Sequence, residues 1–402
     1  MTDLRVEPAP PADARSRRAG RRRRFAILGS RGYPSTYGGF ETFVRRLAPY
    51  LVDVGAEVTV YGRDATRPGH HVSPDGVHVV NTRGYDTRSA STLSHGRAAA
   101  LHAAQEGYDA ALVLNCAMGF WLPGLRAAGI PTLLNVDGIE WERDKWSAVG
   151  KWVFRQGAQL SARHADRLVA DSVGIQDYWR RTFAADTTFI PYGADVLGDL
   201  GHDRLDELGL VPGGFVLAVA RLVPENNVEL LLEAAQRTRH RYPVVVVGSA
   251  SPGDPIAARL EAAGRGADVR WLGHVADQRL LEQLWQHCGV YVHGHSVGGT
   301  NPGLLQALGA GSPTVALDTV YNREVVAAAC PTYGPDPDEL ASRIDLVMGD
   351  ETLRMRLRAA GREIVRTRYA WDDVCRDYLV ELEALAVLRK NHHRWVPREL
   401  AG

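Results

Sequence analysis

The sequence has no apolar run that approaches the roughly 20 residues of a membrane-spanning helix, so no such helix is predicted. Its first apolar stretch, Phe25 to Gly29, is far too short for the core of an export signal. Cysteine is also scarce, and the four cysteines (Cys116, Cys288, Cys330 and Cys375) lack the spacing of a metal site. These absences favour a cytoplasmic protein with reduced, buried thiols.

An excess of charge of either sign is missing too, because 47 Lys and Arg residues balance 47 Asp and Glu residues. No general attraction to nucleic acid is therefore expected. The balance hides one asymmetry, since residues 1–24 carry eight Arg against three acids. Residues 1–23 are predicted to be a disordered, Arg-rich arm. Two interpretations of this arm stay open: peripheral contact with anionic headgroups at the inner face of the plasma membrane, and a solvated tail without a partner.

Short apolar strands alternate with helical patterns from Phe25 onward, and the pattern restarts after the turn-rich break at 191–193. The predicted strands are Phe25–Gly29, Glu57–Tyr61, Val77–Val80, Ala110–Leu114, Pro131–Val136, Arg167–Ala170 and Thr188–Ile190, then Phe215–Val219, Val244–Gly248, Val269–Leu272, Val290–Val292 and Thr314–Leu317. The clearest predicted helices are Glu41–Val54, Lys151–Arg163, Asn227–Arg239, Ile256–Ala263, Gln278–His287, Leu304–Leu308 and Trp371–Leu388. This alternation predicts two Rossmann-like, doubly wound α/β domains whose strand ends face a central cleft. The predicted domains are 24–195 and 196–370, and residues 371–402 are expected to form a helix that crosses back to the first domain, followed by a tail.

A glycine-rich loop between Val292 and Leu304 is the most informative segment of the chain. Gly298 and Gly299 allow the backbone to turn sharply and to approach a ligand closely, and Pro302 suits the first turn of a helix. A glycine loop that leads into a helix N-terminus favours an anion, so this loop predicts a phosphate site.

Three further positions follow predicted strands or precede a helix. Gly38 and Gly39 form a second, weaker phosphate-type loop, for which a tight turn is the alternative. Arg221 stands where a guanidinium can bind a diphosphate, with a surface ion pair as the alternative. Asp137 is a candidate for orienting a substrate, or else for capping a turn through its side chain.

Three segments together carry a family resemblance: RGYPSTYGGFE, ARLVPENN and HSVGGTNPGLLQAL. They resemble a bacterial subgroup of retaining nucleotide-sugar glycosyltransferases of the GT-B fold, a subgroup that includes rhamnosyltransferases of surface-polysaccharide assembly. The resemblance extends over residues 25–388. It implies an acceptor-binding N-terminal domain and a C-terminal domain that binds the sugar nucleotide, with no further cofactor and no metal.

The resemblance also implies the donor-binding residues. Arg221 matches the arginine that neutralises the diphosphate, whereas Asn226 stands where a lysine usually shares that task. The remaining implied contacts come from the second glycine loop, from the segment beside the nucleobase, and from the helix start with its preceding loop: Gly38, Gly39, Gly273, His274, Val275, Gly298, Gly299, Thr300, Asn301, Gly303, Leu304 and Gln306.

The chain departs from many family members at two positions. Gly298 and Gln306 replace two carboxylates that contact the transferred sugar and the nucleotide ribose. The rhamnosyltransferase-like members share the glycine, so a 6-deoxy sugar such as rhamnose becomes the hypothesis for the donor. An amide at Gln306 can still bind a ribose hydroxyl.

The expected reaction is transfer of a sugar from a nucleoside-diphosphate sugar to a polysaccharide or lipid-linked acceptor with retention of anomeric configuration. Arg221 and loop amides would stabilise the leaving diphosphate, and Asp137 would orient the sugar or the acceptor. Glu41 and Glu140 are acceptor-side candidates, although Glu41 also suits the first turn of its helix. Two alternatives remain: a catalytically degenerate protein that only binds, and a nucleotide-sugar epimerase, which would convert the donor without an acceptor.

Overall fold

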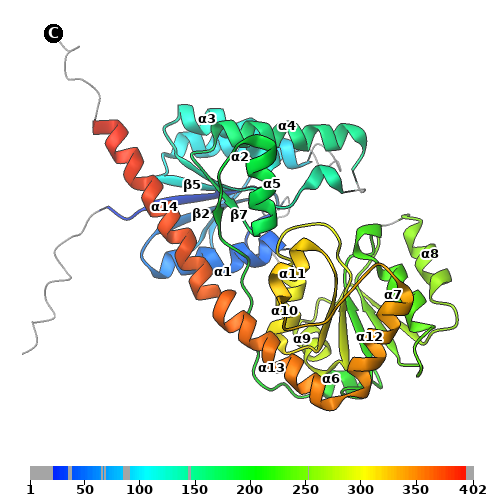
Figure 1. Ribbon diagram of the computed structural model, residues 1–402. Helices are drawn as coiled ribbons and strands as arrows, with labels where there is room; N and C mark the ends of the chain where they lie inside the picture. Colours follow the sequence, from blue (N-terminus) through cyan, green and yellow to red (C-terminus); the bar gives the residue numbers. More distant parts are fainter. Residues whose placement is uncertain are drawn as a thin grey trace, which may run out of the picture.

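The computed structural model describes residues 21–34, 39–64, 67, 69–84, 91–143, 146–251 and 253–394. These residues form two α/β halves, each built on one sheet, with a long C-terminal helix that runs from one half to the other (Figure 1).

The N-terminal half is built on an eight-stranded sheet of order β3-β4-β2-β1-β5-β6-β7-β8. Its strands are β1 (Arg24–Leu28), β2 (Glu57–Gly62), β3 (Gly69–Val72), β4 (His78–Asn81), β5 (Ala110–Leu114), β6 (Thr132–Asn135), β7 (Arg167–Ala170) and β8 (Thr188–Phe189). All neighbouring strands are parallel except β3 and β4. The central strands are apolar at almost every residue because helices cover both faces of the sheet.

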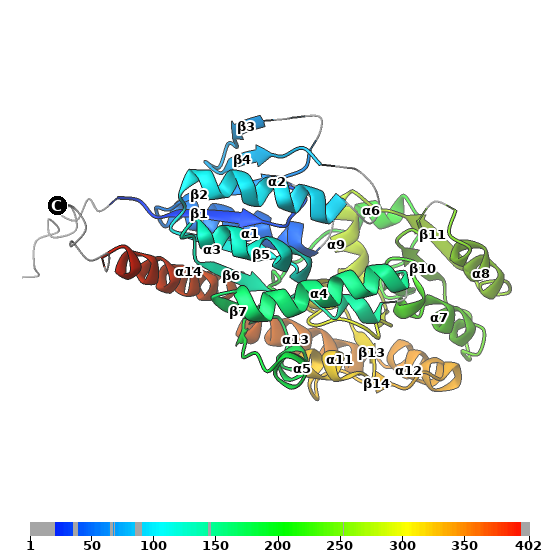
Figure 2. The ribbon, with the colours of Figure 1, turned by 90° about the horizontal axis from the view of Figure 1, so that it is seen from above.

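Alternate residues of these strands pack against two different sets of helices. Phe25 and Ile27 of β1 pack with α1 (Gly39–Asp53) and with the C-terminal helix, whereas Ala26 and Leu28 pack on the other face. That other face is covered by α2 (Ser91–Glu106), α3 (Leu122–Ala127), α4 (Ala148–His164) and α5 (Val173–Phe183), with short 3-10 turns η2 (Cys116–Trp121) and η3 (Glu140–Glu142) between them. Figure 2 shows α2, α3 and α4 lying over the sheet.

The C-terminal half contains a six-stranded parallel sheet of order β11-β10-β9-β12-β13-β14. Its strands are β9 (Val216–Val219), β10 (Val244–Val247), β11 (Val269–Gly273), β12 (Val290–His293), β13 (Thr314–Leu317) and β14 (Thr332–Tyr333). The helical segments are α6 (Asp203–Asp206), η4 (Pro224–Asn226), α7 (Val228–Ala235), α8 (Ile256–Ala263), α9 (Gln278–His287), α10 (Pro302–Ala310), α11 (Val320–Val326), α12 (Pro337–Gly349) and α13 (Glu351–Arg368).

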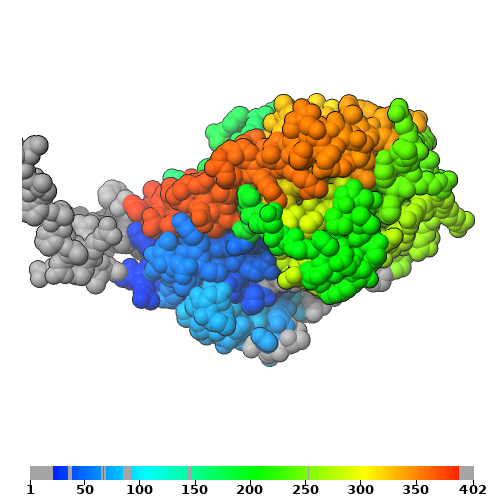
Figure 3. Space-filling view, turned by 90° about the horizontal axis from the view of Figure 1, so that it is seen from below, coloured from blue at the N-terminus to red at the C-terminus, as the bar shows by residue number. Residues whose placement is uncertain are grey.

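The last helix, α14 (Trp371–Arg394), leaves the C-terminal half and packs against α1, β5 and β6 of the N-terminal half. Its Tyr378 is buried, and the Tyr378 hydroxyl accepts a hydrogen bond from the Asn135 amide at 2.7 Å. In the space-filling view of Figure 3, the orange and red C-terminal helices run as one continuous band from one half to the other.

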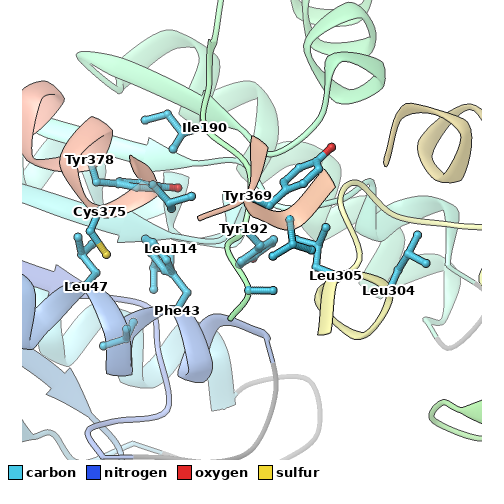
Figure 4. Packing of buried hydrophobic residues seen from close by; sticks show 14 of the residues in the cluster. Phe43, Leu47, Leu114, Ile190, Tyr192, Leu304, Leu305, Tyr369, Cys375 and Tyr378 are labelled. Atoms are coloured by element: carbon cyan, nitrogen blue, oxygen red, sulfur yellow. The ribbon is translucent and has the colours of Figure 1, made fainter. Parts of the chain in front are cut away.

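The junction between the halves is apolar. One cluster of buried residues continues from β5 and α1 through Ile190 and Tyr192 to Leu304 and Leu305 at the start of α10 (Figure 4). Tyr369, at the end of α13, belongs to the same cluster, and its carbonyl accepts a hydrogen bond from Ala194 N–H. The two segments that cross between the halves are therefore bonded to each other.

The predicted fold class, two Rossmann-like parallel α/β domains, is confirmed. Several details differ from the sequence-based predictions, among them the following two. The edge strand β3, which carries His70 and His71, is not among the predicted strands, and in it His70 Nε2 is 3.0 Å from His78 Nδ1. The helix predicted at Leu304–Leu308 begins earlier, at Pro302, because Asn301 caps it by accepting a hydrogen bond from Gly303 N–H. Gly38 lies outside the described residues.

Candidate functional site

Loops at the carboxyl ends of the strands of both sheets meet in one place. A Cβ added to Gly138, after β6, would lie 3.3 Å from the Cα of Gly298, after β12. A Cβ on Gly39 would lie 3.2 Å from Pro302 Cγ, so the start of α1 approaches the start of α10. In parallel α/β sheets ligands bind outside the carboxyl ends of the strands, and this meeting point is therefore the candidate site.

The glycine loop of the C-terminal half is held in place where it leads into α10. Gly298 has a φ of 125°, a conformation that a residue with a side chain rarely adopts. Thr300 is buried, and its hydroxyl donates to the Asp171 carbonyl across the interface. Asn301 and Pro302 then start α10, whose N-terminal end carries the partial positive charge that favours anions.

Asp171 is a carboxyl group with a strongly raised pKa at this interface. It follows β7, is only 3% exposed, and its Oδ1 has no hydrogen-bond partner within the described residues. Burial, together with the negative charges of Asp137 and Glu324, raises the pKa of Asp171 to about 8. A Cβ on Gly299 would lie 1.8 Å from Asp171 Oδ1, so Gly299 is required by this carboxyl group. The sequence analysis did not select Asp171, because no motif surrounds it.

A second carboxylate connects the halves beside Asp171. Glu324 of α11 accepts hydrogen bonds from the backbone N–H groups of Val173, at 2.9 Å, and Gly174, at 3.3 Å. These two N–H groups lie in the first turn of α5 and have no partner within the helix itself. The helix dipole also favours a negative charge at this end. Glu324 therefore ties the C-terminal half to a helix N-terminus of the N-terminal half.

Arg221 and Asn226 lie together after β9, and Asn226 is bonded to the backbone of Arg221. Arg221 is exposed, whereas Asn226 is buried and its Nδ2 donates to the Arg221 carbonyl at 2.8 Å. The amide that replaces the expected lysine thus holds the backbone of the arginine in place. Ser296 of the glycine loop donates to the Glu225 carbonyl at 2.9 Å, so this segment and the glycine loop are also bonded to each other.

His293 and His295 stack with ring centroids 4.4 Å apart. Burial is the main reason that the pKa of each ring is lowered, for His295 to about 3. The charges of Arg221 and Arg143 lower the pKa of His295 further, so both arginines act on the same ring. His293 Nδ1 is 3.1 Å from the Tyr291 hydroxyl. Both rings are therefore neutral, and no group of three or more possible metal-binding side chains occurs within the described part of the chain.

Asp137 is held by two asparagines at the end of β6. Its φ is 60°, its N–H donates to Asn135 Oδ1 at 2.9 Å, and its carboxylate accepts from Asn115 Nδ2 at 3.2 Å. The strained backbone and the two amide contacts fix this carboxylate beside Gly138, at the point where the halves meet. Both alternatives for Asp137, turn formation and substrate contact, are compatible with this position.

The two acceptor-side candidates have partners within the N-terminal half. Glu41 is buried and accepts from Arg31 N–H at 3.2 Å, which places it under the loop after β1. Glu140 is buried between Arg143, whose Nε is 2.8 Å from Glu140 Oε1, and the Trp146 indole N–H, which donates at 2.8 Å. A Cβ on Gly138 would lie 3.3 Å from Arg143 Nη2, so this arginine also belongs to the site, although the sequence analysis did not select it.

The remaining predicted donor-binding residues lie on the C-terminal half. Gly273 ends β11 with a φ of 62°, and its carbonyl accepts from Gly248 N–H at 2.7 Å. His274 is exposed and Val275 half-buried after this turn. Gln306 is half-buried on α10, among the buried residues that pack this helix.

A separate cavity of about 600 Å³ lies near the amino ends of the C-terminal strands. Its arginines come from α13, but their guanidinium groups are already bonded to carbonyls at helix ends. Arg358 donates to the carbonyls of Gly311 and Cys288, at 3.0 and 2.9 Å, and Arg362 donates to the Ala310 carbonyl at 3.3 Å. The arginines of this cavity stabilise helix C-termini, and the cavity is not the candidate site.

Comparison with known proteins agrees with this architecture. Residues 38–193 match the family described as glycosyl transferase 4-like domain, and residues 211–364 match glycosyl transferases group 1. One curated relative is a phosphatidyl-myo-inositol mannosyltransferase of Mycobacterium tuberculosis, 29% identical over 233 residues, which is 54% of this chain and 60% of the relative. The chain therefore spans about 60% of the length of the curated relatives it matches.

Solved structures share the fold along nearly the whole chain. Sucrose-phosphate synthase of Thermosynechococcus elongatus has a TM-score of 0.79 at 19% identity, covering 91% of this chain and 100% of that chain. Anabaena HepE in complex with UDP-glucose has a TM-score of 0.71 at 17% identity, covering 90% of this chain and 99% of that chain. Since these two glycosyltransferase families together extend over more than three quarters of the sequence, the chain is a glycosyltransferase with the GT-B fold, and its C-terminal half belongs to group 1.

Proposed function

We propose that the chain transfers a sugar from a nucleoside-diphosphate sugar to a polysaccharide or lipid-linked acceptor. The observation that carries this proposal is the meeting of the Gly298–Gly299 loop, at the start of α10, with Asp137 and Gly138 of the other half. A helix N-terminus and an arginine on one side suit a diphosphate, and a fixed carboxylate on the other suits a sugar or its acceptor. Anabaena HepE, a structural neighbour, has been solved in complex with UDP and with UDP-glucose, which supports a sugar nucleotide as donor.

The proposed reaction proceeds with retention of configuration. As the glycosidic bond to the diphosphate breaks, negative charge develops on the leaving phosphate. Arg221 and the amides at the start of α10 stabilise that charge in place, which lowers the barrier without a protein nucleophile. The departing phosphate oxygen then accepts the proton of the incoming hydroxyl on the same face of the sugar. Asp137 orients the sugar or the hydroxyl for this step, and no metal ion is needed in the scheme.

Rhamnose is the proposed sugar, because Gly298 presents no carboxylate to bind an additional hydroxyl group. A lipid-linked or polysaccharide acceptor is supported by the similarity to a mannosyltransferase that acts on phosphatidyl-myo-inositol. The Arg-rich arm, residues 1–23, would bring such an acceptor close through anionic headgroups. Residues 1–20 of this arm lie outside the described residues. None of the described helices is both long and apolar enough to cross a membrane.

The test is a matrix of donors and acceptors. Full-length chain is incubated with dTDP-rhamnose, UDP-glucose, UDP-N-acetylglucosamine and GDP-mannose, each with and without lipid-linked saccharide acceptors, and products are identified by mass spectrometry. Transfer with retained anomeric configuration, measured by NMR, is expected for one donor. Conversion of a donor without acceptor would identify an epimerase instead. Binding of a nucleotide sugar without any turnover would identify a degenerate binding protein.

A further inference from the structure

Arg143 belongs to the N-terminal half, yet it reaches the glycine loop of the C-terminal half. Its Nη2 atom would be 3.7 Å from a Cβ on Gly298 and 3.3 Å from a Cβ on Gly138. The Arg143 side chain is only 15% exposed, so its charge is screened little by water. It also acts on the ring of His295, two residues after the end of β12.

The C-terminal half by itself provides few cations for a diphosphate. Arg221 is the only basic residue of the ARLVPENN segment, and Asn226 replaces the lysine that the family resemblance implies. The charge of Arg221 acts on His295, at the start of the glycine loop. The Asn226 amide is bonded to the Arg221 carbonyl at 2.8 Å, which commits one of its donors to the backbone. A nucleoside diphosphate carries at least two negative charges next to this segment, so a second cation would strengthen binding considerably.

Arg143 is fixed in a way that leaves its end group directed at the loop. Glu140 Oε1 contacts the Nε atom at 2.8 Å, and the indole of Trp146 holds the other oxygen of Glu140. The Glu140 carboxylate therefore contacts the Nε atom of Arg143, while the Nη2 atom of Arg143 lies beside Gly138 and Gly298. A guanidinium held this way loses little side-chain entropy when it binds an anion.

We propose that Arg143 is the second cation of the diphosphate site and that it is contributed from the opposite half of the molecule. The inference rests on the proposed function. It adds that the full charge of the site exists only while the two halves are in contact, since Arg221 and Arg143 belong to different sheets. A donor bound to the C-terminal half alone would lack half of the charge that stabilises the leaving group, which would protect the donor from hydrolysis before the halves meet.

The test compares nucleotides that differ by one phosphate. Full-length wild type and Arg143→Gln are titrated by calorimetry with UDP, dTDP and GDP, and with UMP, dTMP and GMP. We expect roughly 10- to 100-fold weaker binding of the nucleoside diphosphate in the variant, the usual scale for a charge-assisted hydrogen bond. Binding of the monophosphate is expected to change by less than about 3-fold. Arg143→Lys should bind the nucleoside diphosphate more tightly than Arg143→Gln but more weakly than the wild type. Lysine keeps the positive charge but lacks the two parallel N–H donors of a guanidinium.

Two further variants separate binding from folding. Arg24→Gln is the matched control, since Arg24 is also part-buried and paired with a glutamate, Glu57, at 2.9 Å, but it stands at the opposite end of β1. Its nucleotide binding should equal that of the wild type. The double variant Glu140→Gln, Arg143→Gln leaves no uncompensated buried carboxylate, so it keeps the fold if the single variant loses it. It should show the same weak binding of the diphosphate.

Each result decides the matter. Diphosphate binding within about 2-fold of wild type in Arg143→Gln and in the double variant would overturn the inference, even if the chain transfers sugar. Binding that depends on Arg143 in a chain that transfers no sugar would support the inference and reject the proposed function. A wild type that binds none of the three nucleoside diphosphates would reject both.

Discussion

Replacing Asp171 by asparagine is expected to change how the stability of the chain depends on pH. Asp171 is buried between the halves against Gly299, and burial raises the pKa of its carboxyl group from 3.8 to about 8. The folded chain therefore keeps this proton over a pH range in which the unfolded chain has already lost it. An asparagine in the same place has no proton to lose.

The size of the effect follows from the difference between the two pKa values. At pH values below about 4 the Asp171 carboxyl group is protonated in both the folded and the unfolded chain. Its stabilising contribution to the folded state is then fully present. As pH rises from about 4 toward 8, this contribution is lost at about 1.4 kcal/mol per pH unit. The loss reaches about 4 kcal/mol at pH 7 and about 6 kcal/mol above pH 8, so the variant should gain stability relative to the wild type by these amounts as pH rises.

Urea unfolding of both proteins between pH 5 and pH 9 measures this difference directly. The difference between the two free energies of unfolding should increase with pH up to about 8 and then become constant. A difference that does not vary with pH would refute the reasoning, because it would mean that Asp171 ionises as easily in the folded chain as in the unfolded one. Asp186→Asn provides the control, since Asp186 is an exposed aspartate of the same half.

Three other substitutions test single contacts. Arg221→Ala should reduce kcat/KM by a factor equivalent to about 3 kcal/mol of lost transition-state stabilisation, and near-normal turnover would reject the role of Arg221. Gly299→Ala would place a methyl group 1.8 Å from Asp171 Oδ1, so steady-state kinetics should show a large loss of activity while circular dichroism shows a folded chain; unchanged activity would contradict this packing. Tyr378→Phe removes the hydroxyl that accepts from Asn135, and denaturant unfolding should show a loss of about 1 to 2 kcal/mol, whereas equal stability would mean that this bond contributes nothing.

The strands of the fold could be predicted well because buried parallel strands are continuous apolar runs. Ala110–Leu114 and Arg167–Ala170 were predicted with the bounds that β5 and β7 have. The edge strand β3, Gly69–Val72, was missed because it is exposed and polar. Its extended conformation depends on antiparallel pairing with β4, a contact that no local pattern reveals.

The candidate site was predictable only where a loop follows its own strand. Gly298, Arg221 and Asp137 could be selected in this way, since each stands just after a strand in the sequence. Asp171 also stands directly after a strand, β7, but nothing in the sequence distinguishes it from other aspartates, and Arg143 follows no strand end. What distinguishes both residues is contact with the other half. Gly299 is 128 positions away from Asp171, and only the folded arrangement shows that the absence of a side chain at one makes room for the carboxyl group of the other.

The path of α14 has a consequence for how the chain reaches its folded state. Tyr378, Leu382 and Leu385 are almost completely buried in the core of the N-terminal half, although they follow the whole C-terminal half in the sequence. At about 5–20 residues per second, the ribosome would finish the C-terminal half before this part of the first core could close. If residues 24–195 were expressed alone, the apolar face that α14 covers would be exposed. The N-terminal half therefore needs the last helix to complete its core, even though each half has its own sheet.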